Sequence, residues 1–219
     1  MKMKHIFTGL IWVAMFIAMS AQAQNLSFDQ KLMAIEQSFD HVNFEIGAKG
    51  SRVDAENALL SQTVQLAKEA PNRAEPLIWE AIILGLQAKD NGGIGALGLA
   101  NNAKSLLEKS IAMNPSAMNA GGYASLGAMY SHVPGFPIAW GDMNKAKTYI
   151  EKALAIAPND IDANYFYADV LYRKGDYANA AKFAQKALAA PARNGRSVGD
   201  AGRRREASAL LKIVAAKGH

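Results

Sequence analysis

Two stretches of helical periodicity, joined by a short Gly-Asp turn, constrain the fold of this chain more than any other feature. In residues 162–174 and 177–190, apolar or small side chains recur every three or four positions, as on one face of a helix: Ala163, Phe166, Tyr167, Val170, Tyr177, Ala180, Ala184 and Ala187. Gly175 allows a tight turn between the two stretches, and Pro191 ends the second. The sequence therefore predicts a helix–turn–helix unit over residues 161–194.

This unit resembles the tetratricopeptide repeat, a pair of helices of about 34 residues. Ala180 and Ala187 stand where two helices approach too closely for larger side chains. The pattern recurs upstream, clearly over residues 75–115 and 120–158, and in degenerate form over residues 28–45 and 55–70. The resemblance implies an all-α, tetratricopeptide-like α-solenoid of about four helical hairpins. A C-terminal capping helix is expected at residues 200–216.

Residues 1–23 are predicted to be a secretory signal peptide rather than part of the fold. Two lysines precede an apolar run from Ile6 to Met19, and small residues follow, so cleavage is expected after Ala23. The apolar run is shorter than the roughly 20 residues that span a bilayer, and a retained anchor is the alternative. Residues 24–219 are then expected to form one helical domain in the periplasm.

The chain contains no cysteine, which narrows its chemistry. Disulfides, thiolate metal ligands and thiol nucleophiles are excluded. The cysteine that carries the lipid of a lipoprotein is also absent, so no lipid anchor of that kind and no stable membrane anchor are expected.

Basic residues are concentrated near the C-terminus. Residues 192–219 contain seven Lys or Arg, while their acidic residues are Asp200 and Glu206. Arg203, Arg204 and Arg205 are expected on the solvated face of the capping helix. One basic terminal helix does not indicate nucleic acid as a partner.

The repeat pattern is interrupted at residues 131–142, where two prolines, two glycines and two large aromatic side chains replace a short turn. The aromatic side chains are expected either to plug the groove between adjacent hairpins or to line a pocket for an apolar or amphipathic ligand. The candidate ligand-binding residues are Tyr130, His132, Pro134, Phe136, Pro137, Trp140, Asp142 and Tyr165.

A second interruption is expected at residues 91–99, which contain the pattern G-x-G-x-x-G from Gly93 to Gly98. Nucleotide binding by this pattern requires a preceding strand and a later acidic residue, and the sequence predicts a helix before it. The glycines are instead expected to let the chain pass closely over a neighbouring helix, or to form a mobile lip.

A narrower resemblance rests on the segment Pro134 to Pro137, on Gly141-Asp142, on residues 145–158 and 162–167, and on Gly199 to Arg204. These segments are similar to the periplasmic T-component (TatT) family, tetratricopeptide proteins associated with TRAP-type solute transporters. The resemblance implies a ligand-accessible cavity and a place beside a transporter and its solute-receptor subunit. Many members look lipid-anchored, and this chain departs from them because it has no cysteine.

The sequence favours binding over catalysis. His41, His132 and His219 form no metal-ligand spacing, so no catalytic residue, metal or cofactor is expected. Asp40 and His41 are interpreted as a surface or capping pair, and Asp160 and Asp162 as helix caps. The alternative function is a protein–protein scaffold of the cell envelope that uses the concave face of the repeats. Its candidate partner-binding residues are Asn164, Tyr172 and Arg173.

Overall fold

The computed structural model describes residues 26–47 and 49–217. The predicted signal peptide, its cleavage after Ala23 and the terminal His219 lie outside these residues. Among the helices described, none is long and apolar enough to cross a membrane.

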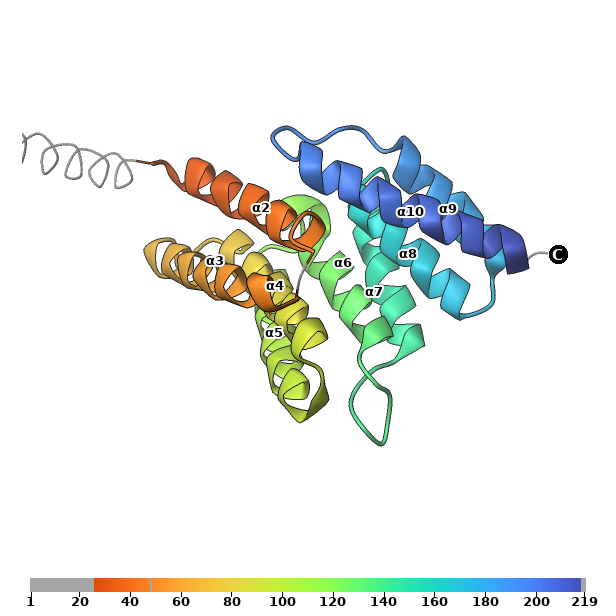
Figure 1. Cartoon of the computed structure of the whole chain (residues 1–219), viewed down its shortest axis with the longest axis horizontal. Helices are drawn as coiled ribbons and strands as arrows, with labels where there is room; N and C mark the ends of the chain where they lie inside the picture. Colours follow the sequence, from red (N-terminus) through yellow and green to blue (C-terminus); the bar gives the residue numbers. More distant parts are fainter. Residues whose placement is uncertain (1–25, 48, 218–219) are drawn as a thin grey trace, which may run out of the picture.

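The described part of the chain is built from nine helices (Figure 1): α2 (Phe28–Phe44), α3 (Lys49–Glu69), α4 (Glu75–Asn91), α5 (Gly93–Met113), α6 (Ala117–His132), α7 (Met143–Ile156), α8 (Ile161–Arg173), α9 (Tyr177–Ala189) and α10 (Ser197–Lys217). Consecutive helices pair into four hairpins, and α10 follows the last of them. The prediction of an all-α solenoid of four hairpins with a C-terminal helix is confirmed.

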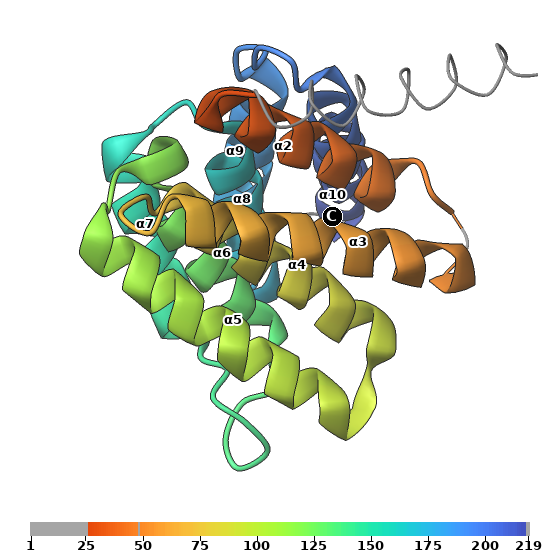
Figure 2. The ribbon, with the colours of Figure 1, turned by 90° about the vertical axis from the view of Figure 1, so that its left-hand side faces the viewer.

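The hairpins are stacked so that their first helices form an inner layer. Within this layer α2 contacts α4, α4 contacts α6, and α6 contacts α8, while the second helices α3, α5, α7 and α9 lie outside. Figure 2 shows the start of this stack, with α2 above α3 and α4, and α5 below them. The inner layer therefore forms one continuous concave face.

Small residues set the distance between paired helices. Ala146, Ile150 and Ala153 on α7 are fully buried. Facing them on α6 is Gly127, where an added Cβ would lie 2.5 Å from Cγ1 of Ile150 and 2.9 Å from the carbonyl oxygen of Ala146. The close packing expected from the repeat pattern thus depends on a glycine at this crossing.

We expect the substitution Gly127→Ala to lower the free energy of unfolding by about 1–3 kcal/mol, because the new methyl group must push α6 and α7 apart. Gly98→Ala is the matched control, since an added Cβ at that helical position meets no atom within 4 Å. It is expected to be neutral or to stabilise the protein by up to about 1 kcal/mol. Urea titrations followed by circular dichroism compare the two, and equal effects would contradict this packing.

Three boundaries differ from the sequence-based expectation. Helix α3 begins at Lys49 rather than Ala55, and α10 begins at Ser197 rather than Asp200. The predicted insertion at residues 91–99 is wrong: the chain turns at Gly92 and Gly93, both with positive φ, and α5 starts at once. An added Cβ at Gly95 or Gly98 would meet nothing within 4 Å, so these glycines do not mark a close passage over another helix.

The last helix packs against the first described helix as well as against its neighbour α9. Along α10, an added Cβ at Gly199 would collide with the carboxylate of Asp40, and one at Gly202 with the ring of Phe44. Arg196, just before α10, donates from Nε and Nη2 to the two oxygens of Asp40 at 2.6 Å each. These contacts join the two ends of the solenoid, which Figure 1 shows as α2 lying beside α10.

This closure corrects two expectations. The C-terminal helix is not simply a solvated cap, because the side chain of Arg203 is only 13% exposed and lies in ion pairs with Asp162 and Glu206. Asp40 is not a surface residue either, since it is 1% exposed and paired with Arg196.

Candidate functional site

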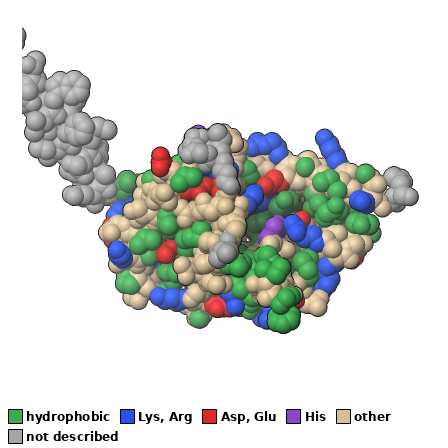
Figure 3. Space-filling model, turned by 60° about the horizontal axis from the view of Figure 1, so that its bottom comes forward, with side chains coloured by type: hydrophobic (Ala, Val, Ile, Leu, Met, Phe, Trp, Pro, Cys, Tyr) green, Lys and Arg blue, Asp and Glu red, His purple; other side chains and the backbone are tan. Residues whose placement is uncertain are grey.

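The concave face encloses a cleft, which we call the central cleft, between α2, α4, α6, α8 and the chain that leads into α10. It consists of one cavity of about 240 Å³ and another of about 290 Å³. Both cavities are lined by Phe39, Ile82, Ser125, Phe166 and Arg203, so they lie next to each other. Figure 3 shows the surface hollowed near its centre, with charged side chains around the hollow.

The first cavity, the polar half of the cleft, is built around Asp162 at the start of α8. The two carboxylate oxygens of Asp162 accept hydrogen bonds from Nε of Arg203 at 2.6 Å and from Nη1 of Arg193 at 2.7 Å. Burial opposes ionisation of Asp162, but the charges of Arg203 and Arg193 outweigh it and hold the pKa of this carboxyl well below its usual range. Asp162 is therefore a fixed negative charge held between two guanidinium groups.

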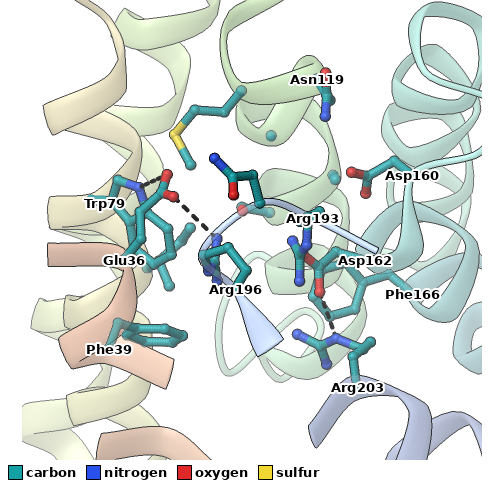
Figure 4. Close-up of a pocket in the computed structure, with 16 residues that line it drawn as sticks. Glu36, Phe39, Trp79, Asn119, Asp160, Asp162, Phe166, Arg193, Arg196 and Arg203 are labelled. Atoms are coloured by element: carbon teal, nitrogen blue, oxygen red, sulfur yellow. Dashed lines mark hydrogen bonds and ion pairs between the residues drawn. The ribbon is translucent and has the colours of Figure 1, made fainter. Parts of the chain in front are cut away.

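Asp160 lies beside this network without a cationic partner of its own. One carboxylate oxygen accepts the backbone N–H of Ala163 at 2.9 Å and so caps α8. Asp160 is in none of the ion pairs found among residues 26–47 and 49–217. Burial and the neighbouring charge of Asp162 raise its pKa to about 6. In Figure 4 its carboxyl group faces the cleft from the α8 side.

The opposite wall of the polar half comes from α2 and α4 (Figure 4). Glu36 accepts a hydrogen bond from the indole N–H of Trp79 at 3.3 Å, and its other oxygen lies 3.7 Å from Nη1 of Arg196. Arg193 also donates to Asp200 at 2.7 Å. The arginine side chains of this cavity are thus already paired within the chain.

One side of the cleft is formed by an unusual turn at the start of α6. Met118, Asn119 and Ala120 have φ angles of 51°, 53° and 63°. This left-handed conformation is disfavoured for residues that carry a side chain, and three in succession are rare. The turn places Met118 and Asn119 at the wall of the polar half.

The second cavity, the apolar half, is lined by more apolar than polar side chains, the polar ones being Asn43, Lys89, Ser125, His132, Arg203 and Glu206. Its walls include Ala81, Ile82, Leu86, Leu107, Ala128, Met129 and Tyr165. The guanidinium of Arg203 lies 4.7 Å from the ring centres of both Tyr165 and Phe166, where the two halves meet. The cleft therefore offers a cluster of ion pairs at one end and, at the other, an apolar wall bordered by Lys89 and Glu206.

The structure brings only two of the predicted ligand-binding residues into this cleft. His132 and Tyr165 both line the apolar half. His132 and Pro134 also border a smaller groove between α4, α5 and the end of α6. Asp142 caps α7 by accepting the backbone N–H groups of Asn144 and Lys145, and these bonds lower its pKa.

The two large aromatic side chains of residues 131–142 lie in different environments, because Trp140 is packed and Phe136 is exposed. Tyr130 is buried and packs edge-on against Trp140 with 4.9 Å between ring centres, and Trp140 donates to Oδ1 of Asn101 at 2.7 Å. Trp140 thus packs between hairpins, as the first alternative expected. Phe136 is 93% exposed beside the exposed Pro137, and it neither fills that groove nor lines the central cleft.

The predicted partner-binding residues differ in how far they are exposed. Asn164 is fully buried and donates to the carbonyl groups of Pro158 and Asp160, so its assignment to a partner surface is wrong. Tyr172 is half-buried with its ring 5.9 Å from that of Tyr177. Arg173 is exposed and pairs with Asp169 at 2.7 Å.

Comparison with known proteins supports the repeat architecture. The profile of the tetratricopeptide repeat family matches residues 138–197. A thermophilic tetratricopeptide repeat protein of Thermus thermophilus has a similar structure, with a TM-score of 0.52 and 21% identity over 81% of this chain and 91% of that one. Two structures of MamA match at TM-scores of 0.42 and 0.41, with 20% and 19% identity, over 80% and 83% of this chain and 95% and 91% of theirs.

No curated protein sequence matches the chain. None of these findings confirms the narrower resemblance to the transporter T-component family. The repeat profile, the four hairpins and the Thermus structure agree on one architecture. The chain therefore has the fold of a tetratricopeptide-repeat α-solenoid.

Proposed function

We propose that this chain is a non-catalytic binding protein that holds a small amphipathic ligand in the central cleft. The observation that carries the proposal is the closure of the concave face by α10 and Arg196, which turns an open repeat groove into a cleft with a polar and an apolar half. Ligand pockets typically have volumes of roughly 300–1,000 Å³ and mostly apolar walls with a few polar groups. The two adjoining cavities fit a small molecule of this kind.

The charge of the cleft selects the polar end of the ligand. Six carboxyl groups surround three guanidinium groups and the ammonium group of Lys89: Glu36, Asp40, Asp160, Asp162, Asp200 and Glu206 against Arg193, Arg196, Arg203 and Lys89. Asp160 is the carboxyl group of this set that has no cationic partner within the described chain. A positively charged head group beside Asp160 would favour its ionised form and so lower its pKa. We therefore assign a cationic or amine head to the ligand, with its apolar part along Ile82, Met129 and Phe166.

We also propose that the protein is exported and acts beside a solute transporter. The basic and apolar residues 1–23 support export to the periplasm. The resemblance of Pro134 to Pro137 and its flanking segments to the T-component family supports a place beside a solute transporter and its receptor subunit. A small ligand held in a closed cleft suits that role because the protein can bind the solute without changing it.

A protein–protein scaffold is the second candidate. Tetratricopeptide repeats typically bind protein partners on extended concave surfaces. Here α10 covers part of that surface, so a partner would have to use the outer helices or exposed positions such as Arg173.

Native mass spectrometry of protein purified from the periplasm, before and after organic extraction, tests the two candidates. A co-purifying small molecule that extraction removes would support the cleft. Capture of a protein partner together with an empty cleft would instead support the scaffold.

A further inference from the structure

The smaller groove between α4, α5 and the end of α6, which we call the side groove, adjoins the apolar half of the central cleft. Its volume is about 240 Å³. Two residues of α4 and two of α6 line both the side groove and the apolar half: Gly85, Lys89, Met129 and His132. Among the described residues, none lines both the side groove and the polar half. The apolar half therefore lies between the polar half and the side groove.

The three spaces follow successive turns of the same two helices. On α6 and the two residues after it, the lining residues fall at positions 118–125 in the polar half, 125–132 in the apolar half and 129–134 in the side groove. On α4 they fall, in the same order, at positions 79–82, 81–89 and 85–89. Because a helix rises about 1.5 Å per residue, this shift along both helices places the three spaces in a row.

The lining of the side groove suits a hydrocarbon chain. Most of its residues are apolar: Ala88, Ala96, Leu97, Ala100, Met129, Val133 and Pro134. The ring nitrogens of His132 are already engaged, since Nδ1 donates to the carbonyl oxygen of Ala128 at 2.9 Å and Nε2 accepts from Arg173 at 3.0 Å. Lys89 is exposed, so its methylene chain borders the groove while its ammonium group stays in water. An alkyl chain therefore fits this groove better than a charged head group does.

Gly85 lies inside α4 at the boundary between the apolar half and the side groove. Glycine is unfavourable in a helix interior, so its presence there needs another reason. Packing does not supply one, because an added Cβ at Gly85 would meet no atom within 4 Å, whereas one at Gly127 would collide with α7. Met129, which lines the boundary from α6, has an unbranched and flexible side chain. The absence of a side chain at Gly85 therefore keeps space open between the apolar half and the side groove.

We propose that the ligand of the central cleft carries a long alkyl chain, which passes Gly85 and Met129 and ends in the side groove. Its head group lies in the polar half, and its chain runs along α4 and α6 through the apolar half. Gly85 then determines how long a chain the protein accepts. This inference rests on the function proposed above and adds the length of the ligand's apolar part.

Titration of one protein with two alkylammonium ions of different length tests the inference. Trp79 fluorescence in the Trp140→Phe protein without residues 1–23 measures binding of octylammonium and dodecylammonium below their micelle-forming concentrations. We expect dodecylammonium to bind at least about tenfold more tightly, because each further buried methylene group favours binding. Ala96→Phe, which fills the side groove at a position that does not line the central cleft, should reduce this difference to about threefold or less.

Gly85→Leu places a side chain at the boundary itself and should reduce the difference in the same way. The variant should be at least as stable to urea as the background protein, because leucine is the better helix former and its Cβ meets no atom. The matched control is Gly98→Leu. Gly98 is an exposed helical glycine that lines neither the side groove nor the central cleft, so dodecylammonium should keep its advantage in this variant.

Equal affinities of the background protein for the two ions would overturn the inference. A preference for dodecylammonium that survives either Ala96→Phe or Gly85→Leu, in a variant that circular dichroism shows to be folded, would also overturn it. Either result, together with saturable octylammonium binding, would leave the function proposed for the central cleft standing. Failure of both ions to bind would overturn that function and this inference together.

Discussion

Replacing Asp40 with alanine is expected to lower the free energy of unfolding by about 3–5 kcal/mol, because it leaves the buried guanidinium of Arg196 with only Glu36, 3.7 Å away, as a charged partner. The two side chains are 1% and 8% exposed, and both carboxylate oxygens accept from the guanidinium at 2.6 Å. The pair also joins α2 to the chain entering α10. Urea unfolding followed by circular dichroism measures the loss.

The double variant Asp40→Ala/Arg196→Met distinguishes loss of the ion pair from loss of packing. Removing both charges leaves no buried guanidinium unpaired, and Glu36 keeps its hydrogen bond from Trp79, so part of the stability lost in the single variant should return. A loss below about 1 kcal/mol in the single variant would show that Arg196 reaches water and that α10 does not close the concave face.

The substitution Asp162→Asn should cost about 3 kcal/mol at neutral pH, at the lower end of the range for buried pairs, since its side chain is 27% exposed. Arg193 and Arg203 would then lose the charge that they share. The effect should depend on pH. The pKa of Asp162 lies below its unfolded value in the folded protein, so its contribution is present above about pH 4 and is lost as the pH falls below that.

The contribution of Asp160 to stability should change with pH in the opposite direction. Its pKa of about 6 in the folded protein lies above the unfolded value, so its contribution to stability is full below about pH 4 and is lost as the pH rises to 6. Asp160→Asn keeps a good helix cap and removes the charge. The free energy of unfolding is measured at pH 3, 5 and 7. Asp162→Asn should destabilise the protein least at pH 3. Asp160→Asn should have its most favourable effect on stability at pH 7. The same pH response in both variants would contradict the assigned network.

The helical hairpins could be predicted because their signals are local. Ala180, Ala184 and Ala187 recur at helical spacing and are all fully buried in the structure. Gly175 and Asp176 mark the turn directly. The glycines after residue 91 misled the prediction, because a tight turn at Gly92 and Gly93 followed by a glycine-containing helix has the same composition as a flexible insertion.

The central cleft could not be predicted because its residues meet only after the chain closes. Asp40 and Arg196 are 156 positions apart. Asp162 and Arg203 belong to different helices that become neighbours when α10 returns across the inner face. From sequence alone, an aspartate at a helix start is explained by capping and an arginine on a terminal helix by solvation. The three left-handed residues from Met118 to Ala120 also give no sequence signal, since none is a glycine.

Binding of a cationic amphiphile to the central cleft is the most direct measurement. In a Trp140→Phe background without residues 1–23, Trp79 is the remaining tryptophan, and its indole lines the cleft. Its fluorescence is followed during titration with octylammonium, octanoate or octanol, using protein freed of co-purified molecules by organic extraction. We expect saturable octylammonium binding at least tenfold tighter than octanoate binding, strengthening as the pH rises through about 6.

Asp160→Asn should abolish that preference for the cation, whereas Asp176→Asn, which changes the equivalent cap of α9, should keep it. Octanol binding should be unaffected by either substitution. Absence of a saturable signal with all three probes, or a cation preference that survives Asp160→Asn, would contradict an amphipathic ligand site in the central cleft.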